Sequence, residues 1–330
     1  MTSSLRPALW DRCISGFLAV AGFALVGLNS PVVSSDAHAA PGLAFGAQSV
    51  DSTPSSARPA PPVSHVPPPR PPSNSPHPPD AQSRLAVRSN IALVEDANTS
   101  EVLLVKKADQ AVPIASITKL MTAIIALDAN LLPEDMLTIS DEDCDPVMGT
   151  TSRLRVGWSL TRADMLHLAL MASENRAAAA LSRYYPGGRP AFIQAMNAKA
   201  AALGMSNTHF VNPNGLTPEN VSTAFDLVKL VQAANQYPLV REYSTDRYYN
   251  VQIGRRILHY VNTNRLIGRA DWDIEVQKTG FISESGECLV MRVNLDGRSL
   301  IMIFLDSYGK LTRFADARRV RMQLALAKGK

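Results

Sequence analysis

Three short groups of residues combine hydroxyls, cations and small or amide side chains in an order that suits nucleophilic catalysis. They are Ser116-Ile117-Thr118-Lys119, Ser173-Glu174-Asn175 and Lys278-Thr279-Gly280. Each group occurs by chance in many proteins when it stands alone. All three in this order, each in a fitting local setting, are a strong signal of a serine nucleophile that works with a lysine.

Ser116 and Lys119 are the candidate nucleophile and base. A serine hydroxyl is a poor nucleophile at neutral pH and needs a base nearby. Residues three apart on a helix share one face, about 5–6 Å apart at Cβ. Lys119 stands in an otherwise apolar stretch, 117–125, and burial favours the neutral form of lysine. The plainer alternatives are a helix N-cap for Ser116 and a lysine that reaches the surface for Lys119.

The other two groups offer residues for proton transfer and substrate binding. Ser173 could relay a proton, and Asn175 could hydrogen-bond a substrate amide, from a junction between two helices. Lys278 and Thr279 offer a cation and a hydroxyl to a substrate carboxylate. Gly280 lets a substrate backbone lie close to a strand. The alternatives are another helix cap for the second group and a surface lysine beside a bulge glycine for the third.

Other catalytic systems find little support in the sequence. Three of the six histidines lie in the first eighty residues, and the others, His167, His209 and His259, are scattered. His167 stands in an apolar helical stretch, which favours a structural role. The chain has no H-E-x-x-H motif, no cluster of histidines, cysteines and acids at metal-ligand spacing, and no glycine-rich phosphate loop. We therefore expect no metal and no cofactor.

The elements that would hold these groups are strands at both ends of a helical middle. Apolar, β-branched runs predict strands at 90–95, 101–107, 276–283, 287–295 and 299–306. Helices are expected at 116–128, 161–171, 175–185, 190–203, 223–235 and 312–328. This order favours an α/β fold of the α+β type, in which helices flank an antiparallel sheet of about five strands.

The N-terminal part is typical of an export leader followed by a linker. Arg6 and Arg12 precede an apolar stretch, and Ala37-His38-Ala39 gives the small-x-small pattern of a cleavage site. We expect a signal peptide at 1–39, with an uncleaved anchor as the alternative. Residues 40–87 hold most of the prolines and should form an extended, disordered linker. That leaves 88–330 as the catalytic domain.

Charge and cysteine content limit the partners. The formal net charge is only +4, and no run of basic residues is present, so we expect no nucleic acid. No segment after the leader is long and apolar enough to span a bilayer, so no stable membrane anchor is expected once the signal is cleaved. Cys144 and Cys288 would reach a compartment that permits disulfides, and whether they pair is left open.

The motifs and their surroundings resemble the low-molecular-mass penicillin-binding proteins, the D-alanyl-D-alanine carboxypeptidase family of serine peptidases. The resemblance covers roughly residues 88–327. Within the family, Asn262-Thr263-Asn264 and the short C-terminal part are most similar to the short D-alanyl-D-alanine endopeptidases. The stretches that carry the family resemblance are Ala115–Thr122, Met171–Ala178, Asn214–Leu216, Asn220–Ala224 and Gln277–Gly280.

The resemblance implies a mechanism, a substrate and a location. Ser116 would attack a D-alanyl carbonyl with Lys119 as general base and form an acyl-enzyme, which water then releases. The backbone N–H groups of Ser116 and Phe281 would form the oxyanion hole. The substrate would be D-alanyl–diaminopimelate crosslinks of peptidoglycan in the periplasm, so the protein would act in cell wall biogenesis and cell shape. Penicillins would acylate the serine as inhibitors.

Three alternatives remain open. A D-alanyl-D-alanine carboxypeptidase would use the same groups, with its preference set by the shape of the cleft. A class A β-lactamase needs a carboxylate to activate the deacylating water, yet none stands between Asn175 and Thr217, and Glu219 is the nearest candidate. A wall-binding protein without catalysis is disfavoured because Ser116, Lys119 and Asn175 are all intact.

Overall fold

The computed structural model describes residues 86–145 and 151–328. These residues all belong to one compact unit, Ser73–Lys330. The expected signal peptide, and all but the last two residues of the expected linker, lie outside the described residues. Near the start of the described range, the backbone N–H groups of Arg88 and Ser89 both donate to the Asp316 carboxylate. No helix in the described ranges is long and apolar enough to cross a membrane.

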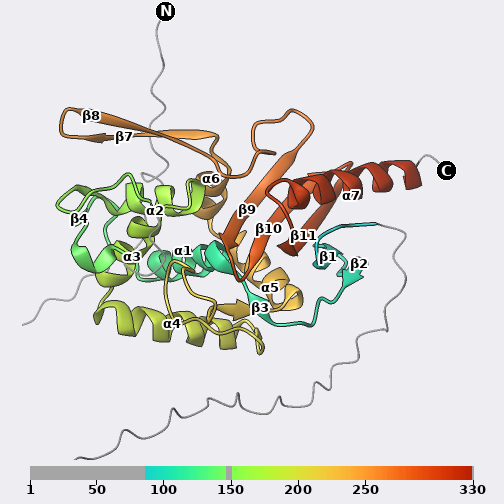
Figure 1. Ribbon diagram of the computed structural model, residues 1–330, viewed down its shortest axis with the longest axis horizontal. Helices are drawn as coiled ribbons and strands as arrows, with labels where there is room; N and C mark the ends of the chain where they lie inside the picture. The colour runs from blue at the N-terminus through green and yellow to red at the C-terminus, as the bar shows by residue number, and fades with distance from the viewer. Residues whose placement is uncertain (1–85, 146–150, 329–330) are drawn as a thin grey trace, which may run out of the picture. The chain divides into compact units, whose positions relative to one another are not determined.

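A five-stranded antiparallel sheet lies at the centre of the described chain (Figure 1). Every residue of its third strand from Ser299 to Leu305 is buried, and strands covered on both faces have continuous apolar sequences. This explains why the sequence predicted all five strands. In spatial order they are β2 (Val102–Lys106), β1 (Ile91–Asp96), β11 (Arg298–Ser307), β10 (Gly286–Leu295) and β9 (Asp273–Ile282).

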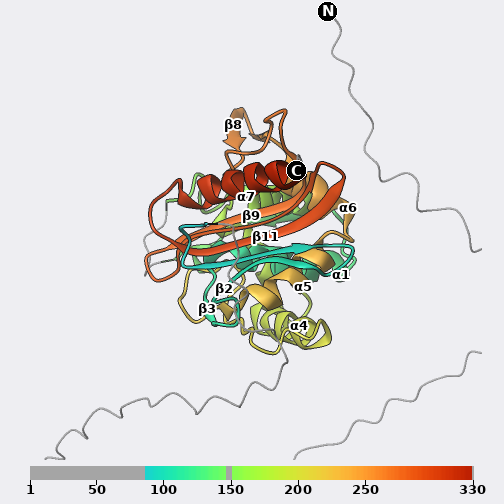
Figure 2. The ribbon, with the colours of Figure 1, turned by 90° about the vertical axis from the view of Figure 1, so that its right-hand side faces the viewer.

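Helices cover both faces of this sheet (Figure 2). The C-terminal helix α7 (Thr312–Lys328) packs on β10 and β11, where its Phe314 and Val320 join a smaller apolar cluster. The helix α5 (Ala224–Ala234) packs on the opposite face, where its Leu230 joins the main core cluster. The predicted α+β fold with a sheet flanked by helices is therefore confirmed.

Of the remaining helices, η2 and α6 pack directly on β9, the strand at one edge of the sheet, and the others pack on these and on one another. In the described ranges they are the short 3-10 helices η2 (Ala115–Thr118) and η3 (Asp141–Asp143), and α1 (Lys119–Asp128), α2 (Arg162–Met171), α3 (Asn175–Arg183), α4 (Gly188–Ala202) and α6 (Pro238–Thr245).

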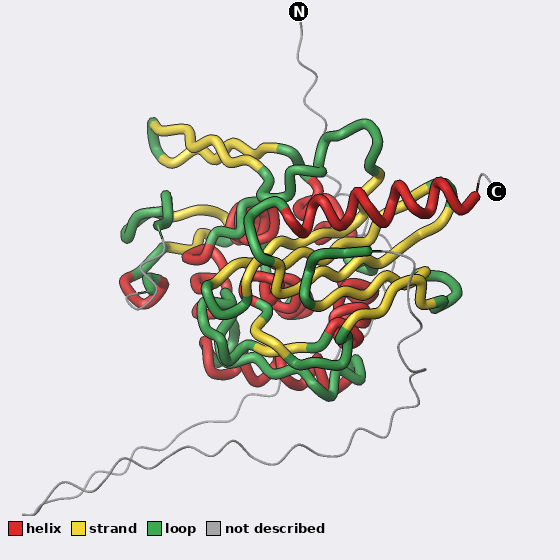
Figure 3. Tube along the Cα trace, turned by 45° about the vertical axis from the view of Figure 1, so that its right-hand side comes forward, coloured by secondary structure: helices red, strands yellow, loops and turns green. Residues whose placement is uncertain are grey.

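Short antiparallel strand pairs accompany these helices, and the longest of them forms a hairpin that extends away from the helices (Figure 3). The pairs are β3 (Val112–Pro113) with β6 (Val221–Ser222), β4 (Met136–Thr138) with β5 (Ser159–Thr161), and β7 (Tyr248–Ile253) with β8 (Arg256–Val261).

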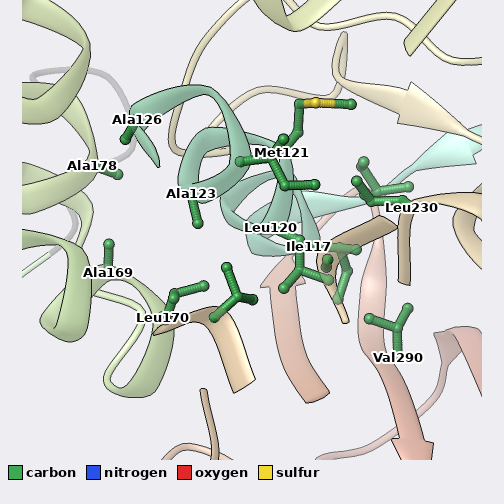
Figure 4. Close-up of a cluster of buried hydrophobic side chains, with 14 of the residues drawn as sticks. Ile117, Leu120, Met121, Ala123, Ala126, Ala169, Leu170, Ala178, Leu230 and Val290 are labelled. Carbon is green, nitrogen blue, oxygen red and sulfur yellow. The ribbon is translucent and has the colours of Figure 1, made fainter. Parts of the chain in front are cut away.

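The helix α1 is apolar on almost every side, as the sequence predicted, because it lies between the sheet and the other helices. At its N-terminal end Ile117 lies near Leu230 and Val290, on the side of α5 and the sheet (Figure 4). Near its other end Ala126 lies beside Ala178 of α3 (Figure 4). Packing on all sides fixes the start of this helix, which is where the first motif stands.

Some local details differ from what the sequence indicated. Ser116 is not a helix cap, because it lies inside η2, while Ile114 and Thr118 hold the N-cap positions of η2 and α1. The strand that was predicted at 276–283 begins earlier, at Asp273, so Lys278 follows five earlier residues of β9. The sequence analysis also missed α6 and the hairpin of β7 and β8. Each of these elements buries only a few residues, such as Val240 of α6, Val251 of β7 and Tyr260 of β8, and most of the hairpin residues are exposed or partly buried.

Candidate active site

Ser116 and Lys119 meet at the start of α1. The helix η2 runs directly into α1, so the two residues lie one turn apart, and Lys119 Nζ lies 2.8 Å from Ser116 Oγ. Ser116 is 8% exposed and Lys119 is 0% exposed. This burial excludes a lysine that reaches the surface. A hydrogen bond between the hydroxyl and the amine is the geometry that general-base activation of a serine requires.

Two more hydrogen bonds hold the end of the Lys119 side chain. Its Nζ donates to Asn175 Oδ1 at 2.7 Å and to the Asn214 carbonyl at 2.6 Å. Burial lowers the pKa of Lys119 to about 7, against the opposing effect of the negative charge on Glu174. A lysine with this pKa is in large part the neutral amine at neutral pH. It can therefore take a proton from Ser116.

A loop on the far side of η2 fixes the backbone that precedes the nucleophile. Ala115 has a φ of 48°, in the left-handed region that residues with side chains seldom adopt. Gly215, with a φ of 79°, packs so tightly on this turn that a Cβ would lie 2.0 Å from the Ala115 carbonyl oxygen. Asn220 joins the loop to η2 by donating to Thr118 Oγ1 at 3.0 Å. The stretches 214–216 and 220–224 thus help to fix the position of Ser116.

The second motif lies at the predicted junction between two helices. The helix α2 ends at Met171 and α3 begins at Asn175. Ser173, between them, has a φ of 59°, so the chain turns sharply there. The turn brings Asn175 to Lys119 and Ser173 to Lys278, whose Nζ donates to Ser173 Oγ at 2.9 Å. The second motif is therefore hydrogen-bonded to both of the others, in a partly buried arrangement.

The third motif lies on β9, which packs against η2. Gly280 approaches so closely that a Cβ would lie 3.2 Å from the backbone nitrogen of Ser116. Thr279 Oγ1 lies 2.6 Å from Thr263 Oγ1, so the Asn262–Asn264 stretch supports the motif from the side. Because β9 is at the edge of the sheet, one side of its backbone can pair with an extended peptide beside the nucleophile.

Arg313 belongs to the site and was not recognised in the sequence. It is 8% exposed at the start of α7 and forms an ion pair with Glu287. Burial, the charge on Lys119 and the charge on Arg313 together hold the pKa of Lys278 well below its usual value. Burial also lowers the pKa of Arg313 to about 10. A bound substrate carboxylate would offset the electrostatic repulsion among these positively charged side chains. Arg313 is far from the motifs along the chain, and only the fold brings it there.

Glu174 is the second residue whose importance the sequence analysis missed. It is 8% exposed, and its Oε1 accepts from the backbone N–H of Arg176 as the cap of α3. Its charge also raises the pKa of Lys119. The available signal was an acidic residue between the serine and asparagine of the second motif. Its effect on Lys119 depends on the turn at Ser173.

The other residues singled out in the sequence lie outside this network. The side chain of Phe281 is 58% exposed, which leaves its backbone to act at the cleft. His167 is buried and stacked between two tyrosine rings, with centroid distances of 4.3 and 3.9 Å, so its role is structural as expected. Cys144 and Cys288 are free thiols. Within the described ranges, no group of three or more histidines, cysteines and acids could hold a metal ion.

Comparison with known proteins places the chain in a family. The sequence profile described as D-alanyl-D-alanine carboxypeptidase matches residues 75–309. The chain belongs to this family. It is accordingly a serine-type D-Ala-D-Ala peptidase, a hydrolase. The D-alanyl-D-alanine endopeptidase of Pseudomonas aeruginosa is 49% identical over 243 residues, which are 72% of this chain and 77% of that protein. The endopeptidase of Escherichia coli is 45% identical over 248 residues, or 74% and 80%.

Solved structures of similar proteins share the fold. The Streptomyces K15 DD-transpeptidase superposes with a TM-score of 0.67 at 29% identity, over 73% of this chain and 98% of that one. Penicillin-binding protein D2 of Listeria monocytogenes, in its cefotaxime-bound form, gives 0.66 at 29% identity, over 74% and 100%. Both agree with a sheet flanked by helices, and they place this peptidase among penicillin-binding proteins.

A class A β-lactamase needs an acid near its serine to activate the deacylating water. In the described chain, the nearest acid that follows the second motif is not placed to do this. Glu219, the nearest downstream candidate, is exposed, and its Oε2 accepts from Thr217 Oγ1 at 3.4 Å. It makes no hydrogen bond to Ser116 or Lys119 in the described chain. The family match and the position of Glu219 both speak against the β-lactamase alternative.

Proposed function

We propose that this peptidase is a D-alanyl-D-alanine endopeptidase that cuts the peptide crosslinks of peptidoglycan. The observation that carries the catalytic part of the proposal is the buried Lys119, with a pKa of about 7, hydrogen-bonded to Ser116 Oγ. The names of the relatives at 49% and 45% identity favour cleavage of crosslinks.

In the first half-reaction Ser116 Oγ attacks the D-alanyl carbonyl carbon while Lys119 takes the hydroxyl proton. The backbone N–H groups of Ser116 and Phe281 stabilise the oxyanion. The proton that Lys119 took then passes to the leaving amine through Ser173, which Lys278 Nζ holds by a hydrogen bond of 2.9 Å. The C–N bond breaks, the amine departs with that proton, and Ser116 keeps the acyl group as an ester.

The other residues of the second and third motifs hold the substrate. The amide of Asn175, already bonded to Lys119, also faces the substrate's peptide group. Thr279 and the nearby cations bind the carboxylate beside the scissile bond, and Gly280 lets the peptide backbone lie close to β9. Water then attacks the ester and releases the cut peptide.

Penicillins are the expected inhibitors, because the strained lactam carbonyl can acylate Ser116 in place of a D-alanyl carbonyl. The Listeria relative has been solved in cefotaxime-bound and ampicillin-bound forms, which supports acylation of this chain as well. Glu219, the nearest acid downstream of Asn175, is exposed and makes no hydrogen bond to Ser116 or Lys119 in the described chain. We therefore expect the penicilloyl ester to be released slowly.

The chain is proposed to work in the periplasm, in cell wall biogenesis and cell shape. The support is the leader pattern at 1–39 and the proline-rich stretch at 40–87, which would precede the domain 88–330 as an extended linker after export. Peptidoglycan peptides are then the partners. The chemistry of Ser116 and Lys119 requires no metal and no cofactor.

Purified protein incubated with defined muropeptides tests the substrate. Crosslinked dimers and uncrosslinked pentapeptide monomers are supplied separately, and products are separated by chromatography. The proposal expects dimers to fall to monomers. Removal of only the terminal D-alanine from monomers would instead identify a carboxypeptidase.

A further inference from the structure

A pocket of about 310 Å³ lies directly beside the second motif. Its walls come from residues 151–153, from the junction 172–175 and from Tyr260 of β8. It therefore shares Ser173 and Asn175 with the catalytic network, yet most of its wall takes no part in the reaction described above. A volume of this order suits a small polar group of a bound ligand.

Two opposite charges line this pocket. The Arg153 guanidinium lies 3.6 Å from the centre of the Tyr260 ring, and its Nη1 donates to the His259 carbonyl. These contacts hold the cation in one position. On the other wall stands Glu174, which is almost fully buried. Within the described chain, its carboxylate accepts only the 3.4 Å capping hydrogen bond from the backbone N–H of Arg176. The pocket thus presents a fixed cation and a carboxylate to the same ligand.

The buried hydroxyl of Tyr260 indicates that a ligand supplies its hydrogen-bond partner. Tyr260 is 1% exposed, and within the described residues its hydroxyl has no hydrogen-bond partner. Burying an unpaired hydroxyl is unfavourable, and such groups usually find a partner in the protein, a water or a ligand. Burial also raises the pKa of Tyr260, so the hydroxyl keeps its proton and can donate to an oxygen of a ligand.

We propose that this pocket binds the free end of a diaminopimelate side chain, which carries both an ammonium and a carboxylate, on the residue before the scissile D-alanine. The proposal rests on the proposed peptidase function. Arg153 and the Tyr260 hydroxyl take the carboxylate, and Glu174 takes the ammonium. A residue next to the scissile D-alanine is the one whose side chain can reach a pocket that begins at Asn175. A lysine side chain would offer the ammonium alone and leave Arg153 without its anion.

Three synthetic peptides that differ only at this residue test the proposal. They carry diaminopimelate with its end free, diaminopimelate amidated at that carboxylate, or lysine, each followed by a D-alanine whose carbonyl is linked to a second diaminopimelate, so that every peptide holds the crosslink that the proposed function cleaves. With the full chain, we expect kcat/KM to be about tenfold higher for the free end than for the other two, the value of one good charge-assisted contact. Arg153→Gln should abolish this preference.

Arg155→Gln is the matched control. Arg155 is an exposed arginine two residues further on, stacked near Trp158 and outside the pocket, so this variant should keep the preference. Tyr260→Phe provides a second test. It should lower the preference a few-fold without lowering the unfolding midpoint, because the hydroxyl has no protein partner to lose.

Benzylpenicillin has no such zwitterionic end. Its acylation rate therefore shows whether a variant affects the pocket alone or the catalytic residues as well. The proposal expects this rate to be the same in wild type, Arg153→Gln and Tyr260→Phe. Equal kcat/KM for the three peptides in the wild type would overturn it. So would a uniform slowing of all peptides and of penicillin by Arg153→Gln, since that variant would then only disturb the loop. If penicillin acylates the protein but no peptide is cut, the proposed function itself is wrong.

Discussion

Lys119 carries the chemistry of the site because burial changes which protonation state it holds at neutral pH. A fall of its pKa from 10.5 to about 7 corresponds to on the order of 5 kcal/mol less favourable protonation. The fixed contacts of its Nζ with Ser116, Asn175 and the Asn214 carbonyl give the amine hydrogen-bond partners in both states. A lysine at the surface would remain charged and could not act as the base.

The pH dependence of acylation follows from this pKa. The neutral amine is the active form, and Lys119 loses its proton as the pH rises through about 7. The second-order rate of penicillin acylation should therefore increase with pH and level off above that value. Rates of labelling by a fluorescent penicillin between about pH 5 and pH 9 measure it. A rate that keeps rising toward the ordinary pKa of lysine would contradict the assignment of Lys119 as base.

Glu174 tunes this base. Its negative charge raises the pKa of Lys119, so Glu174→Gln should lower that pKa further and move the acid limb of the acylation profile to lower pH. Glu219→Gln is a suitable control, because Glu219 is exposed and hydrogen-bonded only to its own loop. An unchanged limb in Glu174→Gln, or one moved to higher pH, would show that the charge does not act on Lys119.

How much of the site could be predicted depends on how local each contact is. Ser116 and Lys119 were predictable because their spacing alone puts them on one helical face. Arg313 and Glu174 were not recognised. The charge of Arg313 reaches Lys278 only because α7 packs on the sheet, and that of Glu174 reaches Lys119 only because the chain turns at Ser173. Contacts of this kind arise from tertiary packing and leave no spacing pattern in the sequence.

The short helix η2 is held between two segments that are distant in sequence, and this clamp fixes the nucleophile. The loop at Gly215 closes on it from one side and β9, through Gly280, from the other. At both positions a side chain would collide with the backbone around Ser116. Glycine here is a requirement of close packing, and at Gly215 also of a positive φ.

Gly215→Ala tests the clamp. Its Cβ would fall 2.0 Å from the Ala115 carbonyl oxygen, so the loop must move, and we expect a destabilisation of more than about 2 kcal/mol together with slower acylation. Gly157→Ala is the control, because Gly157 has a similar φ of 83° with nothing within 4 Å. It should cost only about 1 kcal/mol of backbone strain. Thermal unfolding of both variants measures the difference, and equal losses would refute the clamp.

The fold itself was largely predictable because its elements have strong patterns. The strands β1, β10 and β11 in the middle of the sheet are mostly buried, and α1 is buried all round, so each appears as an apolar run. The helix α6 and the β7–β8 hairpin were missed because they are polar on one side and packed on a few residues only, such as Val240, Val251 and Tyr260. Tertiary contacts, rather than local periodicity, decide such elements.

The site lies where the two parts of the described unit meet, with the first two motifs on the helical side and the third on β9 (Figure 1). Both apolar clusters and every residue of the catalytic network lie within 86–328. We therefore predict that the core that positions the site needs no residue before the described range. The division into leader, linker and catalytic domain stays a prediction.

A chain that starts at residue 86 should therefore fold and react with penicillin at the same rate as the full chain. Its unfolding midpoint should also match, because no described contact of the core is lost. Calorimetry and penicillin labelling of the two proteins measure this. Loss of folding in the shortened chain would mean that the preceding residues form part of the domain.

The covalent bond between penicillin and Ser116 is the most direct test of the whole account. The protein is incubated with benzylpenicillin, digested, and the site of the adduct is located by mass spectrometry. We predict one penicilloyl group per chain, on Ser116, and no adduct in a Ser116→Ala variant that is shown to be folded by circular dichroism. An adduct on another residue, or one that persists in Ser116→Ala, would contradict the account.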